Sequence, residues 1–243
     1  VKLMNQQTSS LLQRLARHTT GTVVYSGKTL YRWIVEGYHS IDPAFRSHLG
    51  QAPLLGLTLL AKPQPNSLKR CEDGHPLVVF VHGLGGHRGN FMPMQRYLKW
   101  MGRSQTISVG FGDKSSIESM AQQLKQTLRR VISVNKIPQN GIQIVAHSMG
   151  GLVSRLALED NEIASHIKTL VTLATPHSGT QLARYLDTRK IRNLRPNSNL
   201  IRRLDQQLPW SKNKDYPRLI CFWTPQDLIL LPPQSAFVDG CKT

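Results

Sequence analysis

The sequence has few cysteines, few acidic residues and no long apolar run, and each shortage excludes a class of protein. Its three cysteines, Cys71, Cys221 and Cys241, form no CxxC pair, so neither a disulfide framework nor a zinc site is indicated. A reducing compartment is therefore expected. No apolar stretch is long enough to span a membrane, and residues 1–18 lack the continuous apolar segment of a secretory signal. These absences predict a cytoplasmic protein, with peripheral membrane contact as an addition.

Acidic residues are also scarce, because 14 Asp and Glu stand against 31 Lys and Arg, a formal charge of +17. Such an excess attracts phosphate-rich partners, either nucleic acid or anionic lipid. The basic residues are scattered, however, and the densest group, 189–195, carries no interleaved aromatic residues. The pattern therefore does not favour nucleic-acid binding. A solvated basic surface is the expected interpretation, and an anionic membrane surface is the alternative.

The chain divides into a preamble and a region of alternating periodicities. Residues 1–50 predict a helical extension, because Leu11, Leu12 and Leu15 share one helical face. From residue 51 onward, short apolar runs alternate with amphipathic segments, which predicts one α/β domain with a mostly parallel sheet and helices on both faces. The expected strands are 54–61, 76–83, 105–111, 142–147, 167–176 and 218–227, and the expected helices include 90–102, 115–132 and the segment after residue 148.

A serine lies where one of these strands becomes a helix. The stretch Ala146-His147-Ser148-Met149-Gly150 fits the G-x-S-x-G turn, with alanine in place of the first glycine. A sharp strand-to-helix turn exposes a serine hydroxyl above the sheet and crowds its neighbours, so small residues are needed on either side. The start of the helix also directs backbone N–H groups at developing negative charge. This pattern predicts that Ser148 is a nucleophile.

A glycine-rich segment after an earlier strand supplies a second part of such a site. His82-Gly83-Leu84-Gly85-Gly86 follows the strand 76–83. An oxyanion hole takes one N–H from the residue after the nucleophile and one from this loop. We therefore expect Met149 and Leu84 to be the donors. His82 is expected to orient the loop rather than to act as the base.

Four segments together resemble one family. They are FVHGLGGHRGNF, VAHSMGGLVSRL, TLATPHSGT and WTPQDLILLPPQSA, in this order along the chain. They resemble the α/β-hydrolase lipases and esterases, and the Ala-x-Ser-x-Gly turn is similar to that of bacterial triacylglycerol lipases. The resemblance implies an α/β-hydrolase fold and a serine carboxylic-ester hydrolase that works through an acyl-enzyme on Ser148. It implies no metal and no organic cofactor, and it makes Gly83, His147 and His177 residues that shape the site.

The family order places an acid after the serine, followed by a histidine. Asp227, after the predicted strand 218–227, is the expected acid, and its role would be to orient the base. The alternative is an ordinary turn aspartate after Pro225. No histidine follows Asp227, since the nine histidines stand at 18, 39, 48, 75, 82, 87, 147, 166 and 177.

Three interpretations account for the absent histidine. The first is that the chain is a fragment, and that the last strand and helix of the fold, with the histidine, lie beyond Thr243. The second is that His177 serves as an unusual base. The third is a hydrolase-fold module that binds lipid or regulates without catalysis. Thioester hydrolysis and acyl transfer would use the same residues, so the substrate stays open between lipid and other hydrophobic esters.

Residues 181–215 form a polar, basic insert where lipases carry a lid. Its apolar residues could form the underside of such a lid, namely Leu182, Tyr185, Leu186, Leu200, Ile201, Leu204 and Leu208. A mobile, positively charged lid would suit an anionic lipid interface. The alternative is an ordinary pair of covering helices.

Overall fold

The computed structural model describes residues 76–241, apart from 104, 113–114, 136, 138–140, 186–188, 208–209, 211–215, 226 and 228. The expected extension over 1–50 and the expected strand 54–61 lie outside the described residues.

A five-stranded parallel sheet forms the centre of the described chain. Its strands are β1 (Leu77–Val81), β2 (Thr106–Val109), β3 (Ile142–His147), β4 (Ile167–Leu173) and β5 (Arg218–Phe222). They lie in the order β2-β1-β3-β4-β5, and every neighbouring pair is parallel. All five fall within the predicted runs. Because the strands are parallel, their carboxyl ends share one edge, and β3 carries Ser148 to that edge.

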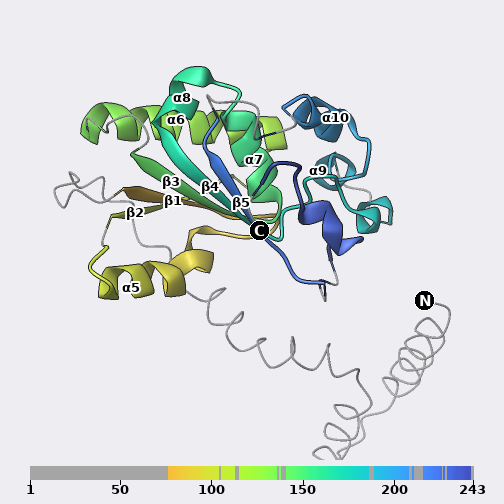
Figure 1. Ribbon diagram of the computed structural model, residues 1–243, viewed down its shortest axis with the longest axis horizontal. Helices are drawn as coiled ribbons and strands as arrows, with labels where there is room; N and C mark the ends of the chain where they lie inside the picture. The colour runs from red at the N-terminus through yellow and green to blue at the C-terminus, as the bar shows by residue number, and fades with distance from the viewer. Residues whose placement is uncertain are drawn as a thin grey trace, which may run out of the picture. The chain divides into compact units, whose positions relative to one another are not determined.

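Helices cover both faces of this sheet, as predicted. Figure 1 shows α6 (Ile117–Asn135), α7 (Met149–Ala157) and α8 (Asn161–His166) on one face, and α5 (Met92–Trp100) on the other. Five apolar residues recur along α6 at helical spacing and are all buried, namely Ile117, Met120, Leu124, Leu128 and Val131. Every residue of α7 is buried. The helix that follows the serine is therefore the central helix of the core, and its position fixes the turn before it.

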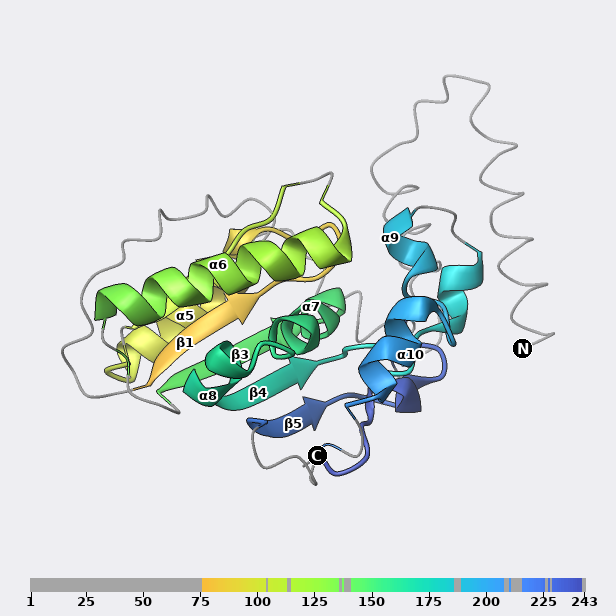
Figure 2. The same ribbon diagram turned by 90° about the horizontal axis from the view of Figure 1, so that it is seen from above.

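The insert lies beyond the carboxyl ends of the strands, where Figure 2 shows α9 (Arg189–Arg192) and α10 (Asn199–Asp205). The α10 side chains Leu200, Ile201 and Leu204 are buried in the main core. This packing favours the covering-helix interpretation for α10 over a mobile lid. Tyr185 is 84% exposed, so it does not pack in the core as these three side chains do, and Leu186 and Leu208 lie outside the described residues.

Two short 3₁₀ helices complete the carboxyl edge. These are η2 (Gln181–Arg184), after β4, and η4 (Pro233–Ala236), after β5. The loops that carry them are joined, because the Gln181 N–H donates to the Leu231 carbonyl over 2.7 Å and the Ser178 N–H donates to the Ser235 carbonyl over 3.0 Å. The segment after β5 is thus attached to the segment after β4.

Candidate active site

Ser148 occupies a strained turn between β3 and α7. Its φ is +53° and its ψ is −129°, a backbone conformation that costs a residue other than glycine about 1–3 kcal/mol. Three hydrogen bonds hold it there. The Ser148 N–H donates to the Leu173 carbonyl over 2.8 Å, and the Ser148 carbonyl accepts from the Gly151 N–H over 3.0 Å and from the Thr175 hydroxyl over 2.9 Å.

The hydroxyl of Ser148 is not used to cap the helix it precedes. A serine in the N-cap position normally accepts a hydrogen bond from the N–H two or three residues later. Ser148 makes no such bond, whereas Ser198 at the start of α10 does. Its Oγ is therefore available for other chemistry, which is the property that the sequence pattern predicts for a nucleophile.

The two glycines after Ser148 are required by close approach of backbone and side chains. A Cβ on Gly150 would lie 2.5 Å from the Val81 carbonyl oxygen, and one on Gly151 would lie 2.2 Å from the Thr175 hydroxyl. Any side chain at either position would push α7 away from β1 and β4. The predicted need for small residues around the turn is thus explained by specific contacts.

The glycine-rich loop after β1 lies directly beside the serine. A Cβ on Gly83 would lie 2.8 Å from the Ser148 Cβ and 3.3 Å from its Oγ. The loop closes on itself through a bond from the Gly86 N–H to the Gly83 carbonyl over 3.2 Å. Leu84 therefore lies in the loop that faces Ser148. Met149 opens α7, so its N–H belongs to the first turn, whose donors have no acceptor within the helix.

His82 is buried beneath this loop. Its Nδ1 lies 2.9 Å from the Gly83 carbonyl oxygen. Since a carbonyl only accepts, Nδ1 carries the proton in this contact. The ring also packs against Phe111, with the ring centres 5.2 Å apart. This geometry agrees with the orienting role expected from the sequence.

Asp227 is fixed by its own loop. One carboxylate oxygen, Oδ1, accepts from the backbone N–H groups of Ile229 and Leu230, each over 2.9 Å. The loop is in turn held by the Thr180 hydroxyl, which donates to the Ile229 carbonyl over 2.9 Å. The turn role proposed as the alternative for Asp227 is therefore present. These two hydrogen bonds involve Oδ1 of Asp227. They are therefore compatible with an acid that orients a base through its other carboxylate oxygen.

His147 and Asp227 are 80 positions apart in sequence, yet the fold brings them within electrostatic reach. Desolvation lowers the pKa of His147, the negative charge of Asp227 raises it, and His82 lowers it further, with a net lowering. The carboxyl edge of the sheet therefore gathers Ser148, His147 and Asp227 from two separate strand ends.

His177, by contrast, has both of its ring nitrogens bound by other residues. It is 1% exposed, its Nδ1 lies 3.3 Å from the Arg155 guanidinium, and its Nε2 lies 3.1 Å from the Thr172 hydroxyl. Arginine only donates, so Nδ1 accepts and the proton sits on Nε2. Burial, and then the charge of Arg155, lower the pKa of His177 well below its usual value. Both nitrogens are engaged, and this argues against His177 as the base for Ser148.

Arg155 is the residue whose importance the sequence did not reveal. It is fully buried in α7, and burial lowers its pKa to about 10. Its Nε donates to the Gln207 side-chain oxygen over 3.1 Å, one Nη donates to the Leu204 carbonyl over 2.6 Å, and its guanidinium lies 5.8 Å from the centre of the Trp210 ring. It thus connects α7 to the insert. The one signal in the sequence was a charge amid the apolar spacing of Leu152, Val153 and Leu156.

Within the part of the chain that the structure describes, no group of three or more His, Cys, Asp or Glu could hold a metal ion. The same residues include no helix of the length and apolarity that a membrane crossing requires. The cytoplasmic location stays a prediction.

Comparison with known proteins agrees with this geometry. Lipase B of Aspergillus fumigatus superposes with a TM-score of 0.58 at 13% identity, over 72% of this chain and 44% of the lipase. The chain has the α/β-hydrolase fold. The sequence profile of the PGAP1-like alpha/beta domain matches residues 111–201 of this chain, which include the serine turn and α7.

Two curated relatives are hydrolases by name. The human lysosomal thioesterase PPT2 is 26% identical over 150 residues, which cover 60% of this chain and 46% of PPT2. Triacylglycerol lipase 2 of Saccharomyces cerevisiae is 30% identical over 141 residues, which cover 55% of this chain and 39% of the lipase. The chain thus spans less than half the length of these relatives. They agree with the resemblance to lipases and esterases, and a bacterial type stays a prediction.

Proposed function

We propose that this protein is a serine hydrolase of acyl esters or thioesters that acts through an acyl-enzyme on Ser148. The observation that carries this proposal is the strained Ser148 turn, whose hydroxyl does not cap α7 and lies beside Gly83. Strain of this kind persists only where the surrounding structure imposes it, and it concentrates at functional sites.

The reaction would proceed in two stages. The Ser148 Oγ attacks the carbonyl carbon and gives its proton to a general base, and the N–H groups of Leu84 and Met149 stabilise the resulting oxyanion. The tetrahedral intermediate then collapses, and the alcohol or thiol leaves with the proton from the base. Water attacks the acyl-enzyme in the same way and releases the carboxylic acid and Ser148.

The reaction also needs a general base. Within the 243 residues, no histidine follows Asp227. We propose that the reaction uses a histidine held by the free carboxylate oxygen of Asp227. On this proposal, imidazole added to the solution raises the rate, because it can accept the proton of the Ser148 hydroxyl.

Exposed apolar side chains at the carboxyl edge support a hydrophobic acyl group. They come from the loop after β1, from the end of β5 and from the loop after it, namely Leu84, Phe222, Trp223, Ile229, Leu231 and Phe237. The names of the relatives, a thioesterase and a triacylglycerol lipase, suggest an acyl ester or thioester substrate. Acyl transfer to an alcohol would use the same intermediate, with the alcohol in place of water.

An anionic lipid surface is proposed as the place where such a substrate is met. The support is the formal charge of +17 together with the exposed apolar side chains just named. Vesicles that contain phosphatidylglycerol should raise turnover, whereas neutral phosphatidylcholine vesicles should not. Equal turnover with both kinds of vesicle would contradict the proposal.

Hydrolysis of matched substrates tests the function. The chain is incubated with p-nitrophenyl hexanoate and with the hexanoyl thioester of N-acetylcysteamine, with and without imidazole. We expect product release that Ser148→Ala abolishes and that Ser133→Ala, an exposed serine on α6, leaves intact. Release that is equal for Ser148→Ala and the unaltered chain in both conditions would contradict an acyl-enzyme. Lipid binding without any Ser148-dependent release would favour the non-catalytic module.

A further inference from the structure

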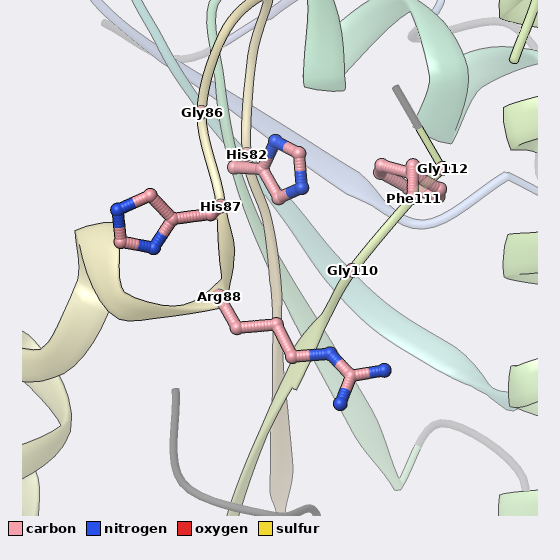
Figure 3. A pocket seen from close by; sticks show the side chains of 7 residues that line it. All are labelled: His82, Gly86, His87, Arg88, Gly110, Phe111 and Gly112. Atoms are coloured by element: carbon pink, nitrogen blue, oxygen red, sulfur yellow. The ribbon is translucent and has the colours of Figure 1, made fainter. Parts of the chain in front are cut away.

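A pocket of about 400 Å³ lies beside the loop that faces Ser148. Figure 3 shows its lining residues, which come from the loop after β1 and from the segment after β2, namely His82, Gly86, His87, Arg88, Gly110, Phe111 and Gly112. The ring of His82 and the guanidinium of Arg88 lie on the side of Gly110 and Phe111, and the His87 ring points to the other side of the loop (Figure 3).

Arg88 is held across a glycine. A Cβ on Gly110 would lie 2.5 Å from the Arg88 Nε and 3.0 Å from its Cγ. Any side chain at position 110 would therefore displace the guanidinium from its present place. The Arg88 backbone is fixed as well, because the Ser108 hydroxyl donates to its carbonyl over 2.8 Å.

The residue before Arg88 is also positioned by the local fold. The Gly89 N–H donates to the His87 Nδ1 over 3.0 Å, and the His87 N–H donates to the Asn90 side-chain oxygen over 3.0 Å. This reciprocal cap starts the 3₁₀ helix η1 (Arg88–Phe91). The point from which the Arg88 side chain departs is therefore defined by several independent hydrogen bonds.

The guanidinium of Arg88 is the formal charge in the lining of this pocket. Among the seven lining residues there is one arginine, two histidines, three glycines and no carboxylate. Glycines let backbone N–H groups approach a ligand closely, and a guanidinium binds phosphate oxygens in a planar, two-point manner. This chemistry suits a phosphate group better than a neutral or cationic one.

The pocket and the nucleophile share one short loop. Gly83 contacts Ser148 at one end of it, and Gly86, His87 and Arg88 line the pocket at the other. The turn bond from the Gly86 N–H to the Gly83 carbonyl keeps the two ends close. A substrate whose carbonyl lies at Ser148 could therefore extend across this loop toward Arg88.

We propose that Arg88 binds a phosphate group of the acyl substrate in this pocket. The inference rests on the proposed function, and it narrows the substrate class to acyl esters or thioesters that carry a phosphate group. The phosphate could belong to a glycerophospholipid or to a phosphorylated thiol carrier of the coenzyme A type. Arg88 is then a specificity-determining residue and takes no part in bond breaking.

Binding measurements on matched ligand pairs test this assignment. The 243-residue chain with Ser148→Ala, which blocks turnover, is titrated by calorimetry with dihexanoyl phosphatidic acid and with dihexanoylglycerol, below the micelle concentrations. A second pair, hexanoyl coenzyme A and the hexanoyl thioester of N-acetylcysteamine, distinguishes the thiol source from the lipid source. Each ligand is also tested on Arg88→Gln, on Gly110→Ala and on Arg96→Gln, an exposed arginine on α5 outside the pocket.

The phosphate-bearing member of at least one pair should bind more tightly than its neutral partner. Arg88→Gln should weaken that ligand by at least about tenfold and leave the neutral one unchanged. Gly110→Ala should weaken it in the same direction, and Arg96→Gln should not. Equal affinity within both pairs, or equal losses for charged and neutral ligands in Arg88→Gln, would overturn the proposal. None of these binding measurements depends on turnover. Tighter binding of the phosphate-bearing ligands by a protein that hydrolyses no substrate would therefore refute only the proposed function.

Discussion

Gly83 lies so close to Ser148 that a Cβ at position 83 would be 2.8 Å from the serine Cβ. We predict that Gly83→Ala shifts the loop and withdraws the Leu84 N–H from the oxyanion. Loss of one such donor lowers the rate by about 100-fold or more. The rate of Ser148 labelling by a fluorophosphonate measures this loss.

A second glycine provides the control for Gly83→Ala. Gly102, at the end of α5, has a φ of +76° and open space where a Cβ would lie. Gly102→Ala should lower stability through its backbone but leave the labelling rate unchanged. If both variants label at the unaltered rate, Gly83 does not set the distance between the loop and the serine.

The backbone of Ser148 gives a prediction about stability that is separate from activity. Ser148→Ala keeps the strain of a side chain at φ +53°, whereas Ser148→Gly removes it, and both remove the nucleophile. Strain of about 1–3 kcal/mol against a glycine entropy cost of about 0.5–1 kcal/mol leaves Ser148→Gly more stable by about 1 kcal/mol. Urea unfolding of the two inactive variants tests this. A lower midpoint for Ser148→Gly than for Ser148→Ala would mean that the turn stores no strain.

Much of this site could be predicted from local sequence. The strand β1 is a continuous apolar run, β3 is an apolar run interrupted by Gln143, and α6 repeats its apolar residues at helical spacing, so their patterns identify them. Ser148, Leu84 and Met149 follow from short motifs whose geometry is local. A residue's neighbours in sequence largely determine such features, which is why the structure places the serine and its loop as expected.

Arg155 leads to a prediction about the insert. Its guanidinium binds Gln207 and Leu204 and faces Trp210, and the single ammonium of lysine would not reproduce these contacts. Arg155→Lys should lower the free energy of unfolding by about 2–3 kcal/mol. Arg130→Lys, on the exposed side of α6, should change it by less than about 0.5 kcal/mol. Thermal unfolding of both measures the difference, and equal midpoints would show that the buried guanidinium is replaceable.

The buried His177 makes stability depend on pH. Its folded pKa lies well below the usual 6.5, so below pH 6.5 the unfolded chain takes up a proton that the folded chain does not. The contribution of His177 to the free energy of unfolding is therefore fully present above about pH 6.5. It decreases as the pH is lowered, by up to about 1.4 kcal/mol per pH unit. The lowered pKa of His147 acts in the same direction.

Unfolding curves between about pH 7 and pH 5 test this linkage. His177→Gln should reduce the slope of stability against pH, and NMR of the unaltered chain should show the His177 ring still neutral at the acidic end. The prediction would be contradicted if the slope of stability against pH were unchanged in His177→Gln. It would also be contradicted if the His177 ring of the unaltered chain titrated near pH 6.5.

The features that sequence did not predict depend on long-range packing. His177 stands in a segment that shapes the site in the family, but its nitrogens are bound by Arg155, 22 residues earlier, and by Thr172. Leu200 and Tyr185 are both apolar residues of the insert, yet one is buried and the other exposed. Leu200 is buried because α10 packs against α7. The pattern of residues within the insert does not predict this packing.

The central claim is that Ser148 is an activated nucleophile, and covalent labelling tests it most directly. The chain is treated with a fluorophosphonate, with and without imidazole, and the modified residue is located by peptide mass spectrometry. The account predicts one adduct on Ser148, faster with imidazole and absent in Ser148→Ala. An adduct on another serine, or no adduct in either condition while a known serine esterase labels fully, would contradict it.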